Sequence, residues 1–495
     1  MKKGAPPIRV LGGAARCLAA ACGLVLAGCV VDQAREVRLY RDVLDTNAPK
    51  PEPLKPGETL TLGRALALAN ADNEQLASQG ETYLQALIEK NRAFAAFLPT
   101  VSFQPNFTAE QAPRGNAPDT APGAPPESAA TAAATAGGYV QDGRVLRRFE
   151  APVVGNMNFS FQSVPLYKKA QIEVAEQRQL LLDAQATILL NVAQTYYQVV
   201  ISTRQVAVLE HALALQQARL ENLEGRYKVR LSLALEVSQA RADEAEARVA
   251  LDRAANDIRN GRRTLALLLD APDVDGPLVD DTLAMEDPPP LAPYVARALS
   301  HRQDLLAAQD AVKAARYDVK AAIAEYYPSA SLNVAGYLYE QNFANASKWN
   351  GILSANLPLF TGGAIRADVR DAWSRLRQAG LFESYLHREI ENGVKTAYDN
   401  LTTSAVLIAE LRHEVQAAQD AYDQAVQMEK TGLAIPLDVL TSQDQLLNAR
   451  LQYASESYTR TILDLDLIRA AGNLDPRTPE SLHWESGANA FAAAP

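Results

Sequence analysis

The feature that most constrains the fold is a pair of very long proline-free stretches, residues 167–229 and 364–430. A proline inside a helix removes a hydrogen bond and clashes with the preceding turn, so its absence allows each stretch to form one continuous helix. At 1.5 Å per residue, such helices would be about 95–100 Å long. Globular helices average three or four turns, so these lengths favour a rod or a tube.

Shorter proline-free stretches flank each long one, so the chain contains two copies of a short, long, short plan. They cover residues 60–97 and 233–269 in the first copy, and 294–326 and 437–471 in the second. An apolar seam with steps of three, four or seven residues occurs in both long stretches, which is typical of helices in a coiled coil. Its members in the two copies are Val192, Tyr196, Val199, Val206, Leu213 and Leu220, and Val394, Tyr398, Leu401, Ile408, Val415 and Tyr422.

Two strand candidates precede the long helix in each copy, at about 100–109 and 153–163 and at about 329–340 and 350–359. Apolar residues such as Val101 and Phe103 alternate there with small polar ones such as Ser102. This pattern fits a membrane barrel wall with lipid on one side and water on the other. Four strands cannot enclose a lumen, because closure needs about eight, whereas three chains would supply twelve.

Any one of these strands would also fit a half-buried strand of a soluble sheet. The duplication, together with the lipid signal described next, favours the barrel. Residues 111–150 are rich in Ala, Pro, Gly and Thr and are expected to form an external loop between the first two strands.

Residues 1–28 have the basic start and short apolar run of a secretory signal. The run is too short for a membrane-spanning helix, which needs roughly 20 apolar residues. The sequence from Leu26 to Cys29 resembles a bacterial lipobox, so Cys29 is expected to become the lipidated first residue of the mature chain. An ordinary signal with a chance cysteine is the alternative. Residues 29–59 are expected to be a lipidated, extended N-terminal segment, and residues 475–495 a C-terminal tail.

Composition and motifs exclude several functions. The formal net charge is −10, which disfavours nucleic-acid binding because phosphate contacts need Lys and Arg. Cys17 and Cys22 lie in the signal, so no disulfide is expected in the mature chain. Neither a Walker-type glycine loop nor histidines with metal-ligand spacing are present, and we expect no enzyme, no cofactor and no metal site.

The motif from Gly432 to Leu440 carries a specific family resemblance. It resembles the glycine-leucine, four residues, Asp-Val-Leu turn of the outer-membrane efflux proteins, and the resemblance covers residues 60 to 474. In physical terms, a glycine can end a helix in the left-handed conformation, and a proline can begin the next helix without losing a needed donor. The turn is formed by Gly432, Leu433, Pro436, Asp438, Val439 and Leu440.

The first copy has a weaker version of this turn over residues 230–237, which keeps an acid at Glu236 but lacks the glycine and the proline. The sequence therefore predicts a turn here without specifying how sharp it is. A second family signature lies at the junction of the fourth strand and the long helix, with Phe360, Gly362 and Gly363.

The resemblance implies a mainly helical fold with a membrane β-barrel. Residues 60–272 and 290–474 would be two repeats of one unit, assembled as a trimeric α-barrel plus a twelve-stranded β-barrel. It implies that Asp438 faces the lumen at the narrow periplasmic end in a threefold acidic ring, whereas the alternative role is a helix-start acid. Some relatives hold this end closed with a tyrosine, an arginine and a second aspartate. The matching positions here are Glu429, Ala434 and Thr441, so that lock is not expected.

The function implied is an outer-membrane channel of a tripartite efflux or type I secretion system, with helices extending into the periplasm. Its partners would be two further copies of the chain, a periplasmic adaptor, an inner-membrane pump of the RND or ABC type, and outer-membrane lipid. A structural coiled-coil lipoprotein and a periplasmic adaptor are the alternatives. The first does not explain the symmetric strands, and the second normally has one helical hairpin where this chain has two.

Overall fold

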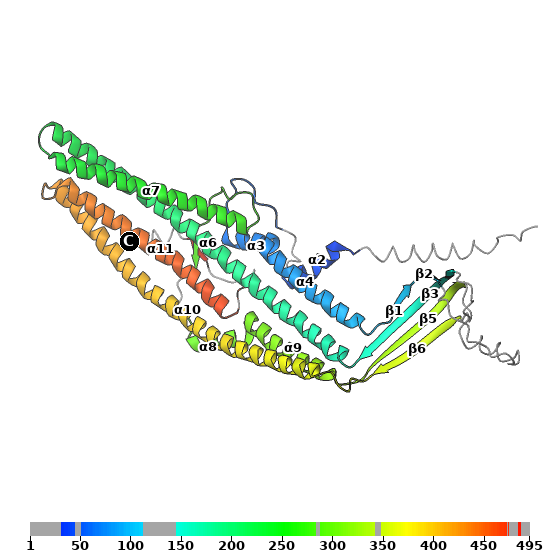
Figure 1. Cartoon of the computed structure of the whole chain (residues 1–495). Coiled ribbons are helices and arrows are strands. Elements are labelled where there is room, and N and C mark those ends of the chain that lie inside the picture. Colours follow the sequence, from blue (N-terminus) through cyan, green and yellow to red (C-terminus); the bar gives the residue numbers. More distant parts are fainter. Residues whose placement is uncertain are drawn as a thin grey trace, which may run out of the picture. The chain divides into compact units, whose positions relative to one another are not determined.

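A computed structural model of the 495-residue chain describes residues 31–44, 51–111, 145–283, 288–341, 348–472, 474 and 484–486. These residues are mainly helical, with a small antiparallel sheet, as the sequence predicts. The chain forms two compact units (Figure 1). Unit 1 consists of Met1–Leu84, Leu181–Leu291 and Thr396–Pro495, and unit 2 consists of Gln85–Leu180 and Ala292–Lys395. Each unit therefore takes segments from both repeats.

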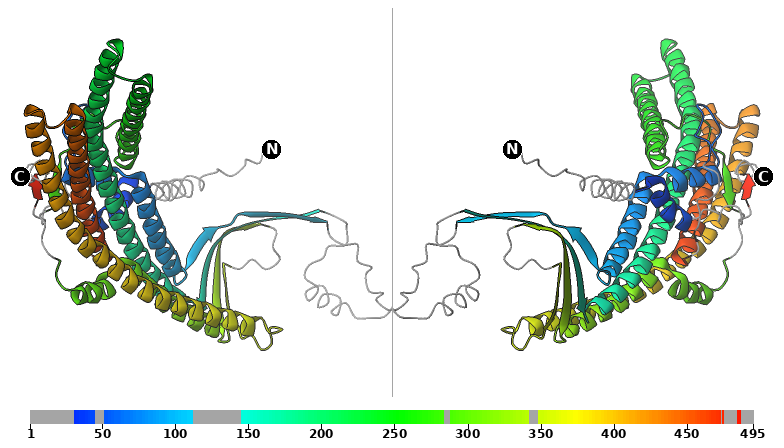
Figure 2. Two further views of the ribbon diagram at one scale, coloured as in Figure 1. Left: turned by 90° about the vertical axis from the view of Figure 1, so that its left-hand side faces the viewer. Right: turned by 90° about the vertical axis from the view of Figure 1, so that its right-hand side faces the viewer.

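Unit 2 contains the sheet, which Figures 1 and 2 show as one curved layer. Its strands are β1 (Thr100–Phe103), β2 (Asn106–Gln111), β3 (Val145–Ser160), β5 (Ser329–Gln341) and β6 (Trp349–Asn356). The order is β1-β3-β5-β6, with β2 also paired to β3, and all pairings are antiparallel. β1 and β2 pair with successive parts of β3, so together they occupy one strand position. The sheet therefore has four strand positions.

The strand boundaries differ from the expected ones in two places. Residues 104–105 interrupt the first strand, where Pro105 lacks an N–H to donate to the ladder. β3 begins at Val145, inside the segment expected to be an external loop. Arg147, Arg148 and Glu150 obscure the alternation there, but pairing with β2 from Asn106 to Gln111 supplies the hydrogen bonds of a strand.

The two faces of the sheet differ in polarity. The register aligns Met157 with Leu332 and Leu332 with Leu353, whereas on the other face it aligns Asn156 with Asn333. The amides of these two asparagines form a hydrogen bond of 2.5 Å. Large apolar side chains on the first face are exposed, including Val101, Phe103, Phe107, Met157, Phe159, Leu332, Val334, Leu353 and Trp349.

The helical part of unit 2 lies next to the strands in the sequence. It comprises the ends of α4 (Glu74–Ala95), α6 (Ser163–Lys228) and α10 (Ala364–Lys430) that fall in this unit, with α8 (Leu291–His301) and α9 (Gln303–Ala324). α9 packs on α10 through a small core of Val319, Ala322, Ala372, Val369 and Leu376. The Lys169 ammonium group of α6 lies 2.8 Å from the Asp318 carboxylate of α9.

Unit 1 contains two helical hairpins, one formed by α6 with α7 (Ala234–Leu268) and one by α10 with α11 (Pro436–Ala470). The repeated seam lines these helices. Val192, Tyr196, Val199, Leu401, Ile408 and Val415 are buried, and Ile408 and Val415 pack against Leu446, Ala449 and Tyr453 of α11. Comparable ion pairs and amide contacts join the helices of each hairpin nearer the turns, such as Arg241–Glu224 at 2.6 Å and Arg450–Gln419 at 2.7 Å.

Two of the expected short helices are interrupted by one residue. α3 (Leu62–Asp72) and α4 are separated at Asn73, and α8 and α9 at Arg302, where the backbone is extended. The Asn73 side chain caps α4, because its carbonyl oxygen accepts a hydrogen bond of 3.0 Å from the Leu76 N–H. Its amide also donates to the Leu268 carbonyl oxygen at 2.9 Å. The break thus ties the first short helix to the end of α7.

The N-terminal segment expected to be extended contains a helix, α2 (Gln33–Val43). The Asp32 carboxylate caps it by accepting hydrogen bonds from the N–H groups of Ala34 and Arg35. Burial of Tyr40 favours the helix further, because its ring fills the space that Gly80 of α4 leaves open. The N-terminal capping residue and this one aromatic contact make a short helix more favourable than an extended chain.

Short crossing segments surround the seam in unit 1. The Tyr196 hydroxyl lies 2.9 Å from the Leu60 carbonyl oxygen and 2.7 Å from that of Val279. Farther along, β4 (Asp281–Leu283) pairs with β7 (Trp484–Ser486) of the expected C-terminal tail.

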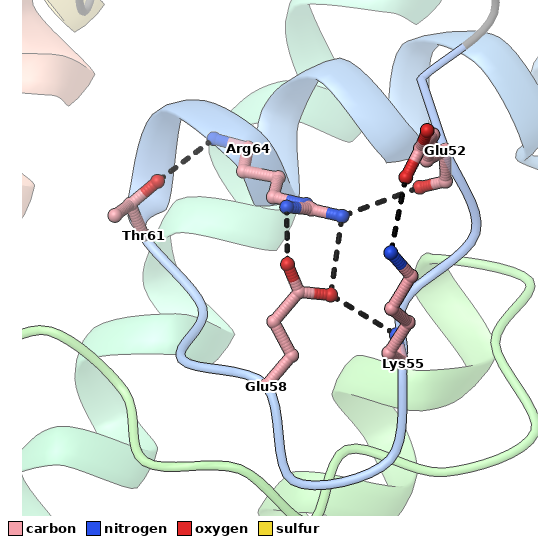
Figure 3. A network of polar contacts seen from close by, with 5 residues as sticks. All are labelled: Glu52, Lys55, Glu58, Thr61 and Arg64. Atoms are coloured by element: carbon pink, nitrogen blue, oxygen red, sulfur yellow. Dashed lines mark hydrogen bonds and ion pairs between the residues drawn. The ribbon is translucent and has the colours of Figure 1, made fainter.

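The segment before α3 is held by a polar network in which the Arg64 guanidinium group forms a bidentate pair with Glu58, at 2.6 and 3.2 Å (Figure 3). Lys55 donates its backbone N–H to the same carboxylate, which lowers the pKa of Glu58.

None of the described helices is both long enough and apolar enough to cross a membrane.

Candidate functional site: the two hairpin turns

The turn between α10 and α11 has the geometry expected from its glycine. Gly432 adopts a left-handed conformation with φ of 75°. Its N–H donates to the Glu429 carbonyl oxygen at 2.9 Å, and the Leu433 N–H donates to the Met428 carbonyl oxygen at 2.8 Å. These two bonds end α10 as a Schellman motif, and Pro436 is the first residue of α11.

The turn between α6 and α7 has the same geometry although it lacks the glycine. Arg230 takes the left-handed conformation with φ of 60°. Its N–H donates to the Tyr227 carbonyl oxygen at 2.9 Å, and the Leu231 N–H donates to the Arg226 carbonyl oxygen at 2.8 Å. The first turn is therefore as sharp as the second, and the sequence departure changes the energy of the turn without changing its path.

A carboxylate closes each turn from the third position of the following helix. The Glu236 carboxylate accepts the Leu233 N–H at 2.9 Å, and the Asp438 carboxylate accepts the Ile435 N–H at 3.0 Å. Two hydrogen bonds lower the pKa of Glu236. The one from the Ser232 hydroxyl has the larger effect, and the one from the Leu233 N–H has the smaller effect. Both acids are exposed, so they are also open to ions and to other chains.

The turns also carry exposed apolar side chains, which sequence reasoning missed in the first copy. Leu231, Leu233 and Leu235 of the first turn are 64–70 % exposed, and Leu433 and Ile435 of the second are 76 % and 58 % exposed. Val439 and Leu440 are half-buried on α11. Both turns lie at the same end of unit 1 (Figures 1 and 2). The apolar residues between the helices could have indicated this exposed surface from the sequence, because a solvated turn normally contains polar residues.

The junction between β6 and α10 contains the second predicted motif. Gly362 and Gly363 both have positive φ values, 64° and 91°, and the Gly363 carbonyl oxygen accepts the first-turn N–H of Ala367 at 3.0 Å. Phe360 is 90 % exposed beside them. The first copy passes from β3 to α6 without such a pair of glycines.

Two further expectations concern the rest of the site. Cys29 lies outside the described residues, so its lipidation stays a prediction. Within the described part of the chain, no group of three or more His, Cys, Asp and Glu side chains is placed to hold a metal ion.

Comparison with known proteins agrees with this architecture. Residues 294–473 match the family model "Outer membrane efflux protein". The outer membrane efflux protein BepC of Brucella suis is 26% identical over 320 residues, which cover 63% of this chain and 69% of BepC. The crystal structure of the outer membrane protein VceC of Vibrio cholerae superposes with a TM-score of 0.67 at 21% identity, covering 83% of this chain and 96% of VceC.

Residues 294–473 belong to the outer membrane efflux protein family. The Campylobacter jejuni CmeC outer membrane channel shares the fold as well, with a TM-score of 0.70 at 16% identity, over 88% of this chain and 89% of CmeC. The family match contains the second hairpin turn, with Asp438, and the Phe360 junction. The first repeat supplies the equivalent turn, which the structure identifies by its hydrogen bonds.

Proposed function

We propose that this chain is the outer-membrane channel subunit of a tripartite efflux or type I secretion system. It would conduct substrates passively from the periplasm and an inner-membrane pump to the exterior, with no reaction of its own. The observation that carries the proposal is the sheet of unit 2, whose exposed face is apolar along four strand positions while the opposite face carries asparagine and serine. Such a sheet is stable where one side meets lipid and the other meets water.

The unpaired edges of this sheet support a trimer. Among the described residues, β1 and β6 each pair with one strand only. Within a membrane, an open edge leaves backbone N–H and C=O groups without partners, which costs several kcal/mol for each group. Pairing of β6 with the β1 edge of the next copy would close the sheet, and three copies would give a barrel of twelve strands.

The hairpin turns would form the periplasmic end of the duct. Three copies of Asp438 would give an acidic ring, and the exposed leucines of both turns would offer an apolar surface for a periplasmic adaptor. Groups of exposed apolar side chains are typical of contact sites between proteins. The pump is proposed to be of the RND or ABC type.

Planar-bilayer recording of the purified full-length protein tests the channel proposal. We expect discrete conductance steps from a particle with the mass of three copies. A stable monomer that never conducts would contradict it, and would favour the structural lipoprotein.

The lipid anchor is a second part of the proposal, and it rests on the sequence from Leu26 to Cys29. Three acyl chains, at about 0.8 kcal/mol for each buried methylene, would hold the chain stably on the outer membrane. Mass spectrometry of the N-terminal peptide is expected to find an acylated Cys29 in the wild type and none after Cys29→Ser. An unmodified Cys29 in the wild type would refute the anchor without affecting the channel.

A further inference from the structure

A hollow of about 530 Å³ opens on the surface of unit 2, where β3 passes into α6 and α9 approaches β5. Its lining consists of apolar and aromatic residues and two exposed lysines. We call the apolar and aromatic residues the floor, namely Phe161, Val164, Pro165, Tyr317, Ala324 and Tyr327, and we call Lys168 and Lys320 the rim. The volume falls within the roughly 300–1,000 Å³ typical of small-molecule sites.

The floor continues the apolar face of the sheet. Phe159, on that face, contacts Phe161 edge to face with ring centroids 5.3 Å apart, and Phe161 contacts Tyr327 at 5.7 Å. All three rings are substantially exposed, between 44 % and 55 %. An occupant of the hollow would therefore be in contact with the same apolar surroundings as the sheet.

The rim selects for negative charge. The Lys320 ammonium group lies 4.5 Å from the centre of the Tyr317 ring, and that of Lys168 contacts the neutral Gln171 amide at 3.3 Å. Neither is paired with a carboxylate among the residues that the structure describes, whereas the neighbouring Lys169 is paired with Asp318. Two lysines above aromatic and aliphatic side chains suit a molecule with a phosphate head and an apolar body.

We propose that this hollow binds an anionic glycerophospholipid of the periplasmic leaflet, with its phosphate between Lys168 and Lys320 and an acyl chain along Phe161 and Tyr327. The inference rests on the proposed function, because it requires the sheet to stand in a membrane with the helices on the periplasmic side. The position of the hollow at the helix ends of the strands selects the periplasmic leaflet. The uncharged glyceride on Cys29 would not use the lysines, which favours a phosphate-bearing lipid.

Native mass spectrometry of the full-length protein, delipidated and mixed with dioleoylphosphatidylglycerol or dioleoylphosphatidylcholine, tests the proposal. We expect the wild type to retain phosphatidylglycerol about tenfold better than phosphatidylcholine, and Lys168→Gln with Lys320→Gln to bring this ratio near one. Lys313→Gln is the matched control, because Lys313 is an exposed lysine of the same helix that does not line the hollow. It should leave the ratio unchanged.

Equal retention of the two lipids by the wild type would overturn the proposal, as would an unchanged ratio in the double variant. A second copy covering the hollow is tested with Lys320→Cys. Its protection from a water-soluble maleimide in the delipidated trimer, but not in the denatured chain, would also overturn the proposal. Bilayer conductance of the same preparation separates the two hypotheses, since a conducting channel without lipid preference contradicts only the lipid site.

Discussion

Arg230 and Gly432 occupy equivalent positions in two turns that make the same hydrogen bonds. A residue with a side chain in the left-handed region is disfavoured by roughly 1–2 kcal/mol relative to the helical region, a cost that glycine avoids. The first turn therefore keeps its path because the helices on both sides and Glu236 hold it, at an energetic disadvantage.

Replacing Arg230 with glycine should stabilise unit 1. We expect Arg230→Gly to raise the free energy of unfolding by about 1 kcal/mol, and the reciprocal Gly432→Arg to lower it by about as much. Urea titration of the helical signal in mild detergent measures both. A loss of stability in Arg230→Gly would show that the guanidinium group makes a favourable contact that outweighs the backbone cost.

Asp438 has a local role and a proposed collective one. As a helix-start acid it accepts the Ile435 N–H, a bond that an asparagine side chain can also make. In a ring of three, the carboxylates would together attract cations. Asp438→Asn should therefore reduce the cation preference of the channel roughly severalfold in bilayer recordings while the trimer persists. Glu236→Gln should do less, and unchanged selectivity in Asp438→Asn would leave only the capping role.

Between elements, two loops of unit 1 approach each other closely. A Cβ atom on Gly276 would lie 1.8 Å from the backbone oxygen of Glu58, the residue held by Arg64 and Lys55 (Figure 3). The segment before α3 and the segment after α7 therefore meet without room for a side chain.

Gly276→Ala should destabilise unit 1 by about 1–3 kcal/mol, because one of the two backbone segments must shift. Gly225→Ala is the matched control, since a Cβ atom there meets nothing within 4 Å and the position is helical. It should stabilise the chain by about 0.5–1 kcal/mol. Thermal unfolding followed by circular dichroism would measure both, and equal effects of the two substitutions would contradict the close approach.

Asp464 on α11 should make stability depend on pH. Burial raises the pKa of this carboxyl to about 6, against 3.8 for the unfolded chain, although the Arg460 charge opposes the shift. The folded state then binds more protons than the unfolded state between these values. Its stabilising contribution is complete below pH 3.8 and is lost as the pH rises through about 6.

The free energy of unfolding should therefore contain a component on the order of 2 kcal/mol that disappears between pH 4 and pH 8. Asp464→Asn should flatten this part of the curve. Denaturant titrations at several pH values would show it, and a wild-type curve with the same slope as the variant's would contradict the assignment.

The sequence predicted the long elements of this fold better than the short ones. A seam repeated over several turns identifies α6 and α10, because many residues report one periodicity. Asn73 and Arg302 interrupt helices without proline or glycine, and only the capping ability of Asn73 hinted at its break. β4 and β7 have three residues each and are about 200 positions apart, so no periodicity can reveal their pairing.

The candidate site was predictable to the same extent. Gly432, Pro436 and Asp438 were recognisable because each of these residue types suits its own backbone position in the turn. The first turn has the same geometry, but Arg230 at the position of the glycine gave no such indication. The direction in which Asp438 points in the assembly depends on neighbouring copies, and no residue pattern within one chain encodes it. The two rim lysines of the unit 2 hollow are 152 residues apart and are brought together only by the packing of α6 on α9.

For the whole molecule, the assembly depends on how the free edges of the sheet are used. β1 presents one edge and β6 the other, and within the described residues each is paired on one side only. If three copies close a barrel, the β1 edge of each copy lies beside the β6 edge of the next, with residues of the same face adjacent.

Disulfide crosslinking between these edges is the most direct measurement. Three double variants place one cysteine at Ser102 on β1 and the other at Asn350, Ile352 or Ser354 on β6. All four positions are on the same face of the sheet. Each single cysteine replacement serves as a control. We expect one double variant, oxidised in outer membranes, to run as a closed species of three chains on a denaturing gel. Each single replacement should remain a monomer. A ladder that continues beyond three chains, a dimer as the end point, or monomers throughout would contradict a trimeric barrel.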